Sequence, residues 1–419
     1  MNVSNKSVSV IIPVIDDLQN LMKLFDSLML QDQLPSEIVV IDSSSNNETE
    51  DYLKNFLYSI PIVYRRVGRA FKGDRITNAI QDIFPRFVSN FNISKGRAYP
   101  YEATNRGVEI AKSEWLAFLD STTIPEKSWI KESLNLIDVK KVDIIFGKTK
   151  YYAQSRYQKI FRAATWGDIG HETMPGTVIK KNLYFPIKEG VRAGGDVEWR
   201  QKVKNSFDWY IPPEANLRYF NVPKNIITSS KKMFIYQMHS ARVNIQHTVK
   251  DIYLGIFLLL SAIIVPKWNL IVGVETSPFF IPNITKTYLL SICAVYFGAL
   301  VINRGLFIQL RDNVFLMNIL KFIIFMISLY CVYNWNESIA GWVEESVWFI
   351  PHITKIFVSL VLLIALIYRG LYFPLTHGIS KSYLFPFTFV LVGILGIVND
   401  LLKAPGYLTG AIISIFIKK

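Results

Sequence analysis

The sequence predicts an α/β domain with a doubly wound, mostly parallel sheet, followed by a helical membrane region. Up to about residue 230, short β-branched apolar runs alternate with amphipathic segments, which is typical of successive β-α units. After residue 251 the apolar runs are longer and the charged residues occur in short clusters between them, as in membrane-spanning helices. The length of 419 residues also exceeds one ordinary hydrophobic core, so two domains are expected.

The first region begins with a predicted strand over 8–14 (VSVIIPV), a continuous apolar run of the kind buried in a parallel sheet. A helix over 18–30 follows, and Asp16 or Asp17 can cap it. The arginine-rich segment 65–99 is expected to be an excursion between sheet elements. Further strands are expected over 38–41, 62–64, 115–119 and 142–146, with helices ending near residue 58 and over 127–137.

Acidic residues close two of these predicted strands. Asp42 follows the run IVVI, and Asp120 follows the run WLAFL. The carboxyl ends of parallel strands meet at one edge of the sheet, where doubly wound folds bind their ligands. Both carboxylates are therefore expected at a ligand-binding edge, although an acid in this position also often caps the next helix.

The second region contains five segments that approach the roughly 20 apolar residues needed to span a bilayer. We therefore expect a globular domain over 1–230, a basic juxtamembrane segment over 231–251 and a transmembrane helical region over 252–419. No charged pair is expected at mid-membrane depth, which argues against a transporter. The candidate spans are 252–271, 287–302, 314–333, 353–368 and 384–398.

Charge asymmetry predicts the orientation in the membrane. The loop 334–352 contains Glu337, Glu344 and Glu345 but no lysine or arginine, whereas the segments 231–250 and 303–313 are basic. The positive-inside rule then places the N-terminal domain in the cytosol. The opening apolar run is short and follows no cationic region, so it is predicted to be a strand and not a signal peptide.

The formal net charge of +13 calls for an anionic partner. Lipid headgroups and a nucleoside diphosphate both satisfy this requirement, and no nucleic-acid-binding module is legible, so nucleic acid is not expected. The two cysteines, Cys293 and Cys331, lie inside apolar runs. A disulfide framework and a zinc site are therefore not expected.

Three stretches together resemble the family 2 glycosyltransferases of the GT-A fold over roughly the first 230 residues. The first is the pair of strand starts, SVIIPVIDD and EIVVIDSSSNNET. The second is YEATNRGVEIAKSEWLAFLDSTTIPEKSW, and the third is PGTVIKK followed by EGVRAGGDVEWRQKV. The Gln-x-x-Arg-Trp signature of processive synthases is absent from the sequence. The resemblance therefore implies a non-processive enzyme of bacterial surface-polysaccharide assembly, located in the inner (cytoplasmic) membrane.

The resemblance implies a nucleotide-sugar site at the predicted sheet edge. Asp120 and Thr122 would hold Mg²⁺ or Mn²⁺, which neutralises the charge that develops on a departing diphosphate. Thr122 stands where the second Asp of the family's DxD motif is expected, and Thr104 stands where the family often has Arg. The residues expected to contact the donor are Pro13, Asp42, Asn105 and Asp120.

The resemblance assigns the general base to Asp196, which would take the proton from the acceptor hydroxyl. Gly195 precedes it where the family usually has Glu. Arg192, Glu198 and Trp199 are expected on the acceptor side, where Trp199 would form a platform for a sugar ring. The alternatives are that Asp196 is a helix N-cap after two glycines and that Trp199 packs in the core.

The function implied is inverting transfer of a sugar from a nucleoside diphosphate sugar to a membrane-held, lipid-linked glycan acceptor. The alternative is a degenerate, non-catalytic member that binds sugar nucleotides or scaffolds a membrane complex, because three usual motif positions have changed. A nucleotidyltransferase is less favoured, since the loop VIDDLQN after the first strand contains no glycine to cradle a phosphate.

Overall fold

The computed structural model describes residues 6–55, 59–68, 98–243, 245, 268–273, 275–282, 284, 359 and 362–416. The chain divides into two compact units. The first comprises Met1–Ile245 together with Tyr368–Lys419, and the second comprises Gln246–Ile367. In the second unit the described residues include the short helix α11 (Trp268–Val272).

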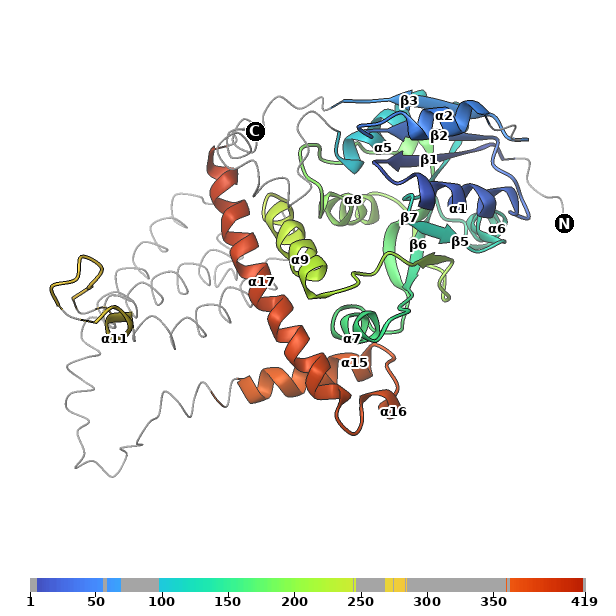
Figure 1. Ribbon diagram of the computed structural model, residues 1–419. Helices are drawn as coiled ribbons and strands as arrows, with labels where there is room; N and C mark the ends of the chain where they lie inside the picture. Colours follow the sequence, from blue (N-terminus) through green and yellow to red (C-terminus); the bar gives the residue numbers. More distant parts are fainter. Residues whose placement is uncertain are drawn as a thin grey trace, which may run out of the picture. The chain divides into compact units, whose positions relative to one another are not determined.

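The described strands of the first unit form one nine-stranded sheet (Figure 1). Its order is β3-β2-β1-β4-β7-β6-β9-β5, and β8 pairs with β6 off this path. The strands are β1 (Val8–Val14), β2 (Glu37–Asp42), β3 (Ile62–Arg66), β4 (Trp115–Phe118), β5 (Thr123–Pro125), β6 (Ile144–Tyr151), β7 (His171–Lys180), β8 (Trp209–Tyr210) and β9 (Leu217–Tyr219).

The sheet is mixed, which refines the mostly parallel sheet expected from the sequence. β1 pairs in parallel with both β2 and β4, and β2 pairs in parallel with β3. In the other half, β7 runs antiparallel to both β4 and β6, and β5 runs antiparallel to β9. The parallel half thus has the doubly wound arrangement that was predicted, and the whole is a mixed α/β domain.

Helices cover both faces of the parallel half because alternate residues of its strands point to opposite sides. Val10 and Ile12 of β1 share a core with α1 (Leu18–Met29) and α6 (Trp129–Lys140). Ile11 shares a second core with α5 (Pro100–Ile110) and α8 (Gly195–Lys204). One face of α1 is buried, and it carries Leu21, Leu24, Phe25 and Leu28. The remaining helices of this part are α2 (Glu48–Asn55) and α7 (Arg156–Thr165).

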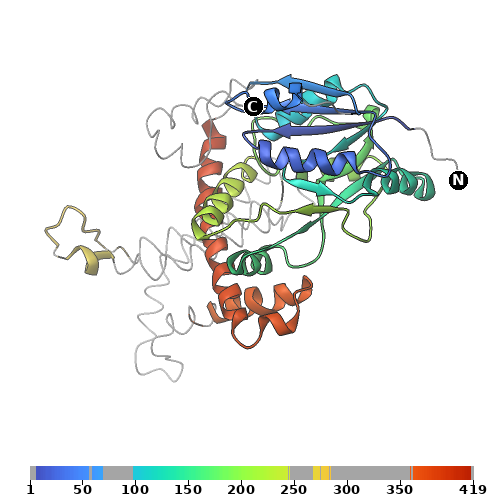
Figure 2. The ribbon, with the colours of Figure 1, turned by 45° about the vertical axis from the view of Figure 1, so that its right-hand side comes forward.

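Within the first unit, the helix α9 (Ile226–Ser240) lies beside a C-terminal group of helices, as both views of the ribbon show (Figure 2). Met233 of α9 packs with Phe161, Val222 and Leu395. The predicted domain boundary at residue 230 is therefore wrong, because it cuts through a helix whose apolar face is buried within the unit. The C-terminal elements are η4 (Tyr368–Tyr372), α15 (Phe373–Thr376), α16 (Lys381–Leu384) and α17 (Thr388–Phe416).

The helix α17 crosses α9 at close range. A Cβ atom added at Gly406 would overlap the carbonyl oxygen of Phe234, and one added at Gly410 would overlap that of Met238. Only glycine allows two helix backbones to approach this closely. The crossing fixes α9 against the C-terminal helices.

The predicted membrane spans are described only in part. The spans 287–302 and 314–333 lie outside the described residues, as do most of 252–271 and 353–368. The span 384–398 begins at the last residue of α16 and continues, after a turn, into α17, which extends well beyond residue 398. Among the described helices, one segment, Thr388–Tyr407, is long and apolar enough to cross a membrane. A buried core helix meets the same criteria, so the membrane region stays a prediction.

The helix α17 takes part in a buried ion-pair cluster. Asp400 lies inside the candidate segment of α17 and is 2% exposed. Its carboxylate forms ion pairs with Arg369 at 2.6 Å and with Lys403 at 3.2 Å. A buried carboxylate is stable only with such partners.

Candidate active site

The two strand-closing acids lie at the same edge of the sheet. Asp42 is the last residue of β2, and Asp120 comes two residues after β4. Since β1 lies between these strands and pairs in parallel with both, their carboxyl ends point the same way. Asp42 and Asp120 therefore lie at one edge of the sheet, and ligand binding at this edge stays a prediction.

Both carboxylate oxygens of Asp42 are hydrogen-bonded. Its Oδ1 accepts from the backbone N–H of Ser44 at 2.8 Å, and its Oδ2 accepts from the Tyr64 hydroxyl at 2.9 Å. Burial, followed by the Asp42 charge, raises the pKa of Tyr64 well above its usual value. The phenol therefore stays protonated and keeps donating to the carboxylate. Any contact between Asp42 and a nucleotide has to use the remaining lone pairs, and this contact stays a prediction.

The surroundings of Asp120 disfavour the charged form of its carboxyl. Burial and the nearby charge of Asp196 raise the pKa of its carboxyl to about 6, and Lys232 offsets part of this rise. Asp120, Asp196 and Lys232 are therefore close enough to interact electrostatically. A second cation at this carboxylate would relieve the repulsion between the two acids.

The residues beside Asp120 fit the predicted metal only if the donor supplies ligands. In the parts of the chain that the structure describes, no three His, Cys, Asp or Glu side chains gather as a metal cluster. The Asp120 carboxylate and the Thr122 hydroxyl are hard oxygen ligands, which Mg²⁺ and Mn²⁺ prefer, and Mg²⁺ is commonly held by one or two carboxylates plus substrate phosphates and water. This donor set is compatible with a metal bound together with a diphosphate.

The turn after Asp120 is tied to the start of α1. The Ser121 hydroxyl donates to Asp17 Oδ2 at 2.7 Å, and the Thr123 hydroxyl donates to the Asp120 carbonyl at 2.8 Å. Asp17 occupies the N-cap position of α1, but its side chain makes no capping bond. The predicted N-cap position of Asp17 is confirmed, but its carboxylate accepts from Ser121 across the sheet edge and does not cap the helix.

Asp196 approaches the same edge from the first turn of α8. The N-cap of this helix is Gly194, whose φ of 88° lies in the left-handed region that favours glycine. A Cβ at Gly195 would lie 2.8 Å from the Tyr101 ring. The change from the family's usual Glu to Gly195 thus accommodates Tyr101, and Asp196 is not the N-cap.

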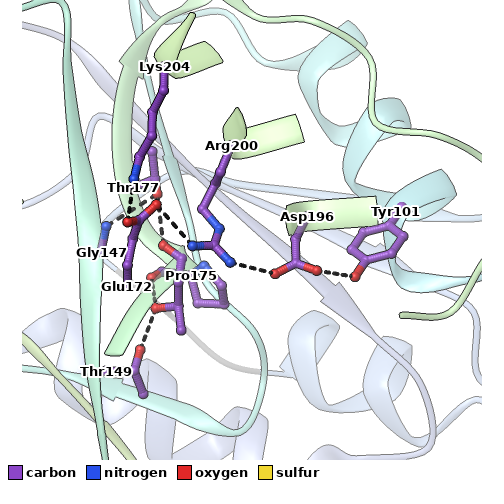
Figure 3. A network of polar contacts seen from close by, with 10 residues as sticks. Tyr101, Gly147, Thr149, Glu172, Pro175, Thr177, Asp196, Arg200 and Lys204 are labelled. Carbon is purple, nitrogen blue, oxygen red and sulfur yellow. Dashed lines mark hydrogen bonds and ion pairs between the residues drawn. The ribbon is translucent and has the colours of Figure 1, made fainter. Parts of the chain in front are cut away.

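The Asp196 carboxylate lies between a phenol and a guanidinium (Figure 3). The Tyr101 hydroxyl donates to Oδ1 at 2.7 Å, and Nη2 of Arg200 lies 3.6 Å from Oδ2. Burial, followed by the Asp196 charge, raises the pKa of Tyr101 well above its usual value. Tyr101 therefore remains a hydrogen-bond donor that orients the carboxylate.

Arg200 is held in turn by Glu172 of β7. Its Nη1 lies 2.9 Å from Glu172 Oε1, and Lys204 lies 2.6 Å from Oε2 of the same carboxylate. Figure 3 shows this chain running from Tyr101 through Asp196 and Arg200 to Glu172. Sequence reasoning missed these partners. The i, i+4 spacing of Asp196 and Arg200 on one helix was the one available signal.

Asn105 anchors the loop that precedes α8. Its Oδ1 accepts from the Ile187 backbone at 2.9 Å and from the Tyr184 hydroxyl at 2.6 Å. Its Nδ2 donates to the Ile187 carbonyl at 2.8 Å and to Glu189 at 3.2 Å. The hydrogen-bonding capacity of the amide is then full. We therefore reassign Asn105 from donor contact to loop anchor.

Trp199 lies in the core and not on the acceptor side. It is 3% exposed, and its Nε1 donates to the Phe185 carbonyl at 2.7 Å. Its ring meets those of Phe118 and Phe146 edge to face. The predicted sugar platform is corrected to core packing. The other predicted contacts, Pro13, Arg192 and Glu198, are half-buried, and their roles stay predictions.

Comparison with known proteins identifies the domain that carries Asp42 and Asp120, and the match ends one residue before Asp196. A family model described as Glycosyl transferase family 2 matches residues 9–83 and 74–195. These stretches include β1, β2, β4 and the start of α8. Residues 9–195 thus match a glycosyl transferase family 2 domain. The predicted enzyme class, a glycosyltransferase, is confirmed at the level of this domain.

Known relatives are similar at low identity. The chain is 24% identical over 216 residues to the glycosyltransferase AglE of Haloferax volcanii. This match covers 48% of the chain and 62% of the relative's length. The crystal structure of S. aureus TarS 1-349 in complex with UDP-GlcNAc aligns at 14% identity and a TM-score of 0.40, over 79% of this chain and 92% of that one. A longer TarS structure aligns with a TM-score of 0.37, over 70% of this chain and 49% of that one, again at 14% identity.

Proposed function

We propose that the protein is an inverting glycosyltransferase that moves a sugar from a nucleoside diphosphate sugar to a hydroxyl of a membrane-held, lipid-linked glycan acceptor. The observation that carries the proposal is the electrostatic interaction of Asp196 with Asp120, which lies just beyond the carboxyl end of β4. One acid follows a strand and the other begins a helix, so the two can serve opposite sides of one substrate. Transfer with inversion needs this arrangement, because nucleophile and leaving group lie in line.

On the acceptor side, Asp196 acts as the general base. The acceptor oxygen attacks the anomeric carbon, its proton passes to Asp196, and the bond from that carbon to the nucleoside diphosphate breaks. The hydrogen bond from Tyr101 and the ion pair with Arg200 hold the carboxylate in place for this transfer. A positioned base contributes about 10²–10⁴-fold to the rate of such a reaction.

On the donor side, Asp120 and Thr122 are the residues that would hold Mg²⁺ or Mn²⁺. Such an ion supplies charge to neutralise the departing diphosphate. Asp42 and Pro13, at the ends of β2 and β1, are the proposed contacts for the nucleotide. Arg192 and Glu198 flank Asp196 and are the proposed contacts for the acceptor.

The acceptor is proposed to be membrane-held because of the apolar C-terminal part of the sequence and the apolar segment of α17. A sugar acceptor on a lipid carrier presents its hydroxyl near the bilayer surface, where a cytosolic domain anchored in the inner membrane can reach it. Surface-polysaccharide assembly in bacteria is the setting that we propose for this transfer.

A degenerate, non-catalytic sugar-nucleotide-binding or scaffolding protein is the second candidate. Thr104 and Thr122 favour it, because both depart from the usual motifs. Gly195 does not favour it, since the Tyr101 ring fills the space that a larger side chain would need.

The two candidates differ in turnover. Purified full-length protein in detergent, with a membrane lipid extract as acceptor, is tested for nucleoside diphosphate release from a panel of sugar nucleotides. We expect release with at least one donor, an anomeric configuration in the product opposite to that of the donor, and loss of release in Asp196→Asn. Equal release by both proteins would remove Asp196 as base, and binding without any release would favour the second candidate.

A further inference from the structure

Lys232 of α9 lies in an aromatic box next to the acid pair. Its Nζ is 5.2 Å, 5.4 Å and 5.6 Å from the ring centres of Tyr219, Tyr236 and Trp166. Tyr151 stacks on Trp166 at 4.1 Å with an interplanar angle of 5°, which extends the wall of the box. Aromatic faces attract an ammonium group through their negative π-clouds.

The pairing of β5 with β9 places this aromatic box beside Asp120. Tyr219 lies opposite Thr123 in the antiparallel pairing of β9 with β5. The Lys232 ammonium donates to the Tyr219 hydroxyl at 3.1 Å. The turn that follows Asp120 leads into β5, and the Lys232 ammonium is hydrogen-bonded to a residue of the neighbouring strand β9. Lys232 lies near enough to lower the pKa of Asp120.

The ammonium keeps its charge and has unused donors. Burial would lower the pKa of Lys232, but the hydroxyls of Tyr236 and Tyr219 outweigh it and raise the pKa. An ammonium group has three N–H donors, and the Tyr219 hydroxyl takes one of them. Among the ion pairs of the described residues, none involves Lys232. Its charge is thus held in place by π-faces and left available to an anion.

We propose that Lys232 binds the diphosphate of the donor directly, and that it supplies positive charge to the departing nucleoside diphosphate beside Asp120. The inference rests on the proposed function, because it assigns a contact within the same donor site. With Thr122 in place of a second acid, the edge offers fewer carboxylates for a metal. A fixed ammonium compensates, since it stabilises the leaving charge without adding a metal ligand.

The test measures binding of UDP and GDP, as probes, to purified full-length protein in Mn²⁺. Lys232→Met keeps the length of the side chain and removes its charge. Lys231→Met, on the same helix, is the matched control, and Lys232→Arg tests rescue. Loss of one charge-assisted hydrogen bond predicts about 10–100-fold weaker binding of the diphosphate in Lys232→Met. Uridine and guanosine, which lack phosphate, should bind the variant and the wild type alike.

Each outcome supports or overturns the proposal. A folded Lys232→Met protein that binds the nucleoside diphosphates as tightly as the wild type overturns it, as does an equal loss in Lys231→Met. A change in the Mn²⁺ concentration that half-saturates binding would show that Lys232 acts through a metal, which also overturns direct contact. If Lys232→Met fails to fold, Tyr219→Phe replaces it, with a several-fold loss expected and no loss contradicting the proposal. A wild-type protein that binds neither probe overturns the proposed function itself.

Discussion

At the scale of single residues, the carboxyl of Asp120 sets the expected pH dependence. Its pKa is raised to about 6 by burial and by Asp196. Only the charged form attracts a cation, so donor use should decline as the pH falls through about 6. We expect an acid limb near pH 6 in the profile of kcat/KM, which reports groups of the free enzyme. Lys232→Met should move this limb to higher pH, because Lys232 lowers the pKa of Asp120. A limb that does not move would contradict the electrostatic contact.

Tyr101 and Tyr64 offer a matched pair of substitutions. Each phenol donates to one acid, Tyr101 to Asp196 and Tyr64 to Asp42. Tyr101→Phe should lower kcat by about tenfold, the value of one charge-assisted hydrogen bond, and leave the KM of the donor unchanged. Tyr64→Phe should raise the KM of the donor instead. Steady-state kinetics of both variants check the division of labour, and an identical kinetic change in both would contradict it.

Sequence alone placed the acids better than their partners. Asp42 and Asp120 could be predicted because a strand end is visible in the apolar pattern, and Asp196 because its surroundings resemble a motif. Trp199 and Asn105 were misassigned, because the same residue type serves a core as well as a binding site. Tyr101 and Lys232 could not be found, since tertiary packing brings them to the site from distant segments.

At the scale of elements, α9 depends on its crossing with α17. Gly410→Leu would force a side chain into the carbonyl oxygen of Met238, so the two helices must separate. We expect a lower melting temperature and, because α9 carries Lys232, weaker nucleoside diphosphate binding. The control is Ile394→Ala on the same helix, since Ile394 is 50% exposed. Thermal unfolding with and without nucleotide measures both effects. An unchanged melting temperature in Gly410→Leu would contradict the close crossing.

The elements themselves were largely predictable, and their directions were not. The run VSVIIPV forms a strand that is buried on both faces, which leaves a continuous apolar run in the sequence. The leucines after it form a helix that is buried on one face, which leaves a helical period. No such period reveals that β7 (HETMPGTVIK) runs antiparallel between β4 and β6. Its polar first residues also hide it from a search for apolar runs.

At the scale of the whole molecule, hydropathy separated two regions but misplaced their boundary. Residues 368–416 return to the first unit, and α17 packs there against α9. An apolar helix can bury its surface against protein or against lipid, and its sequence looks the same in both cases. Composition therefore could not assign α17 to the catalytic unit.

The central claim is that Asp120 serves the donor and Asp196 serves the acceptor within one site. The most direct test measures donor affinity and turnover separately for Asp120→Asn and Asp196→Asn. We predict that Asp196→Asn binds the sugar nucleotide like the wild type and turns it over at least about 100-fold more slowly, as expected for a lost general base. Asp120→Asn should lose donor affinity as well as turnover. An Asp196→Asn protein with undiminished turnover, or with weakened donor binding as its main defect, would contradict the assignment.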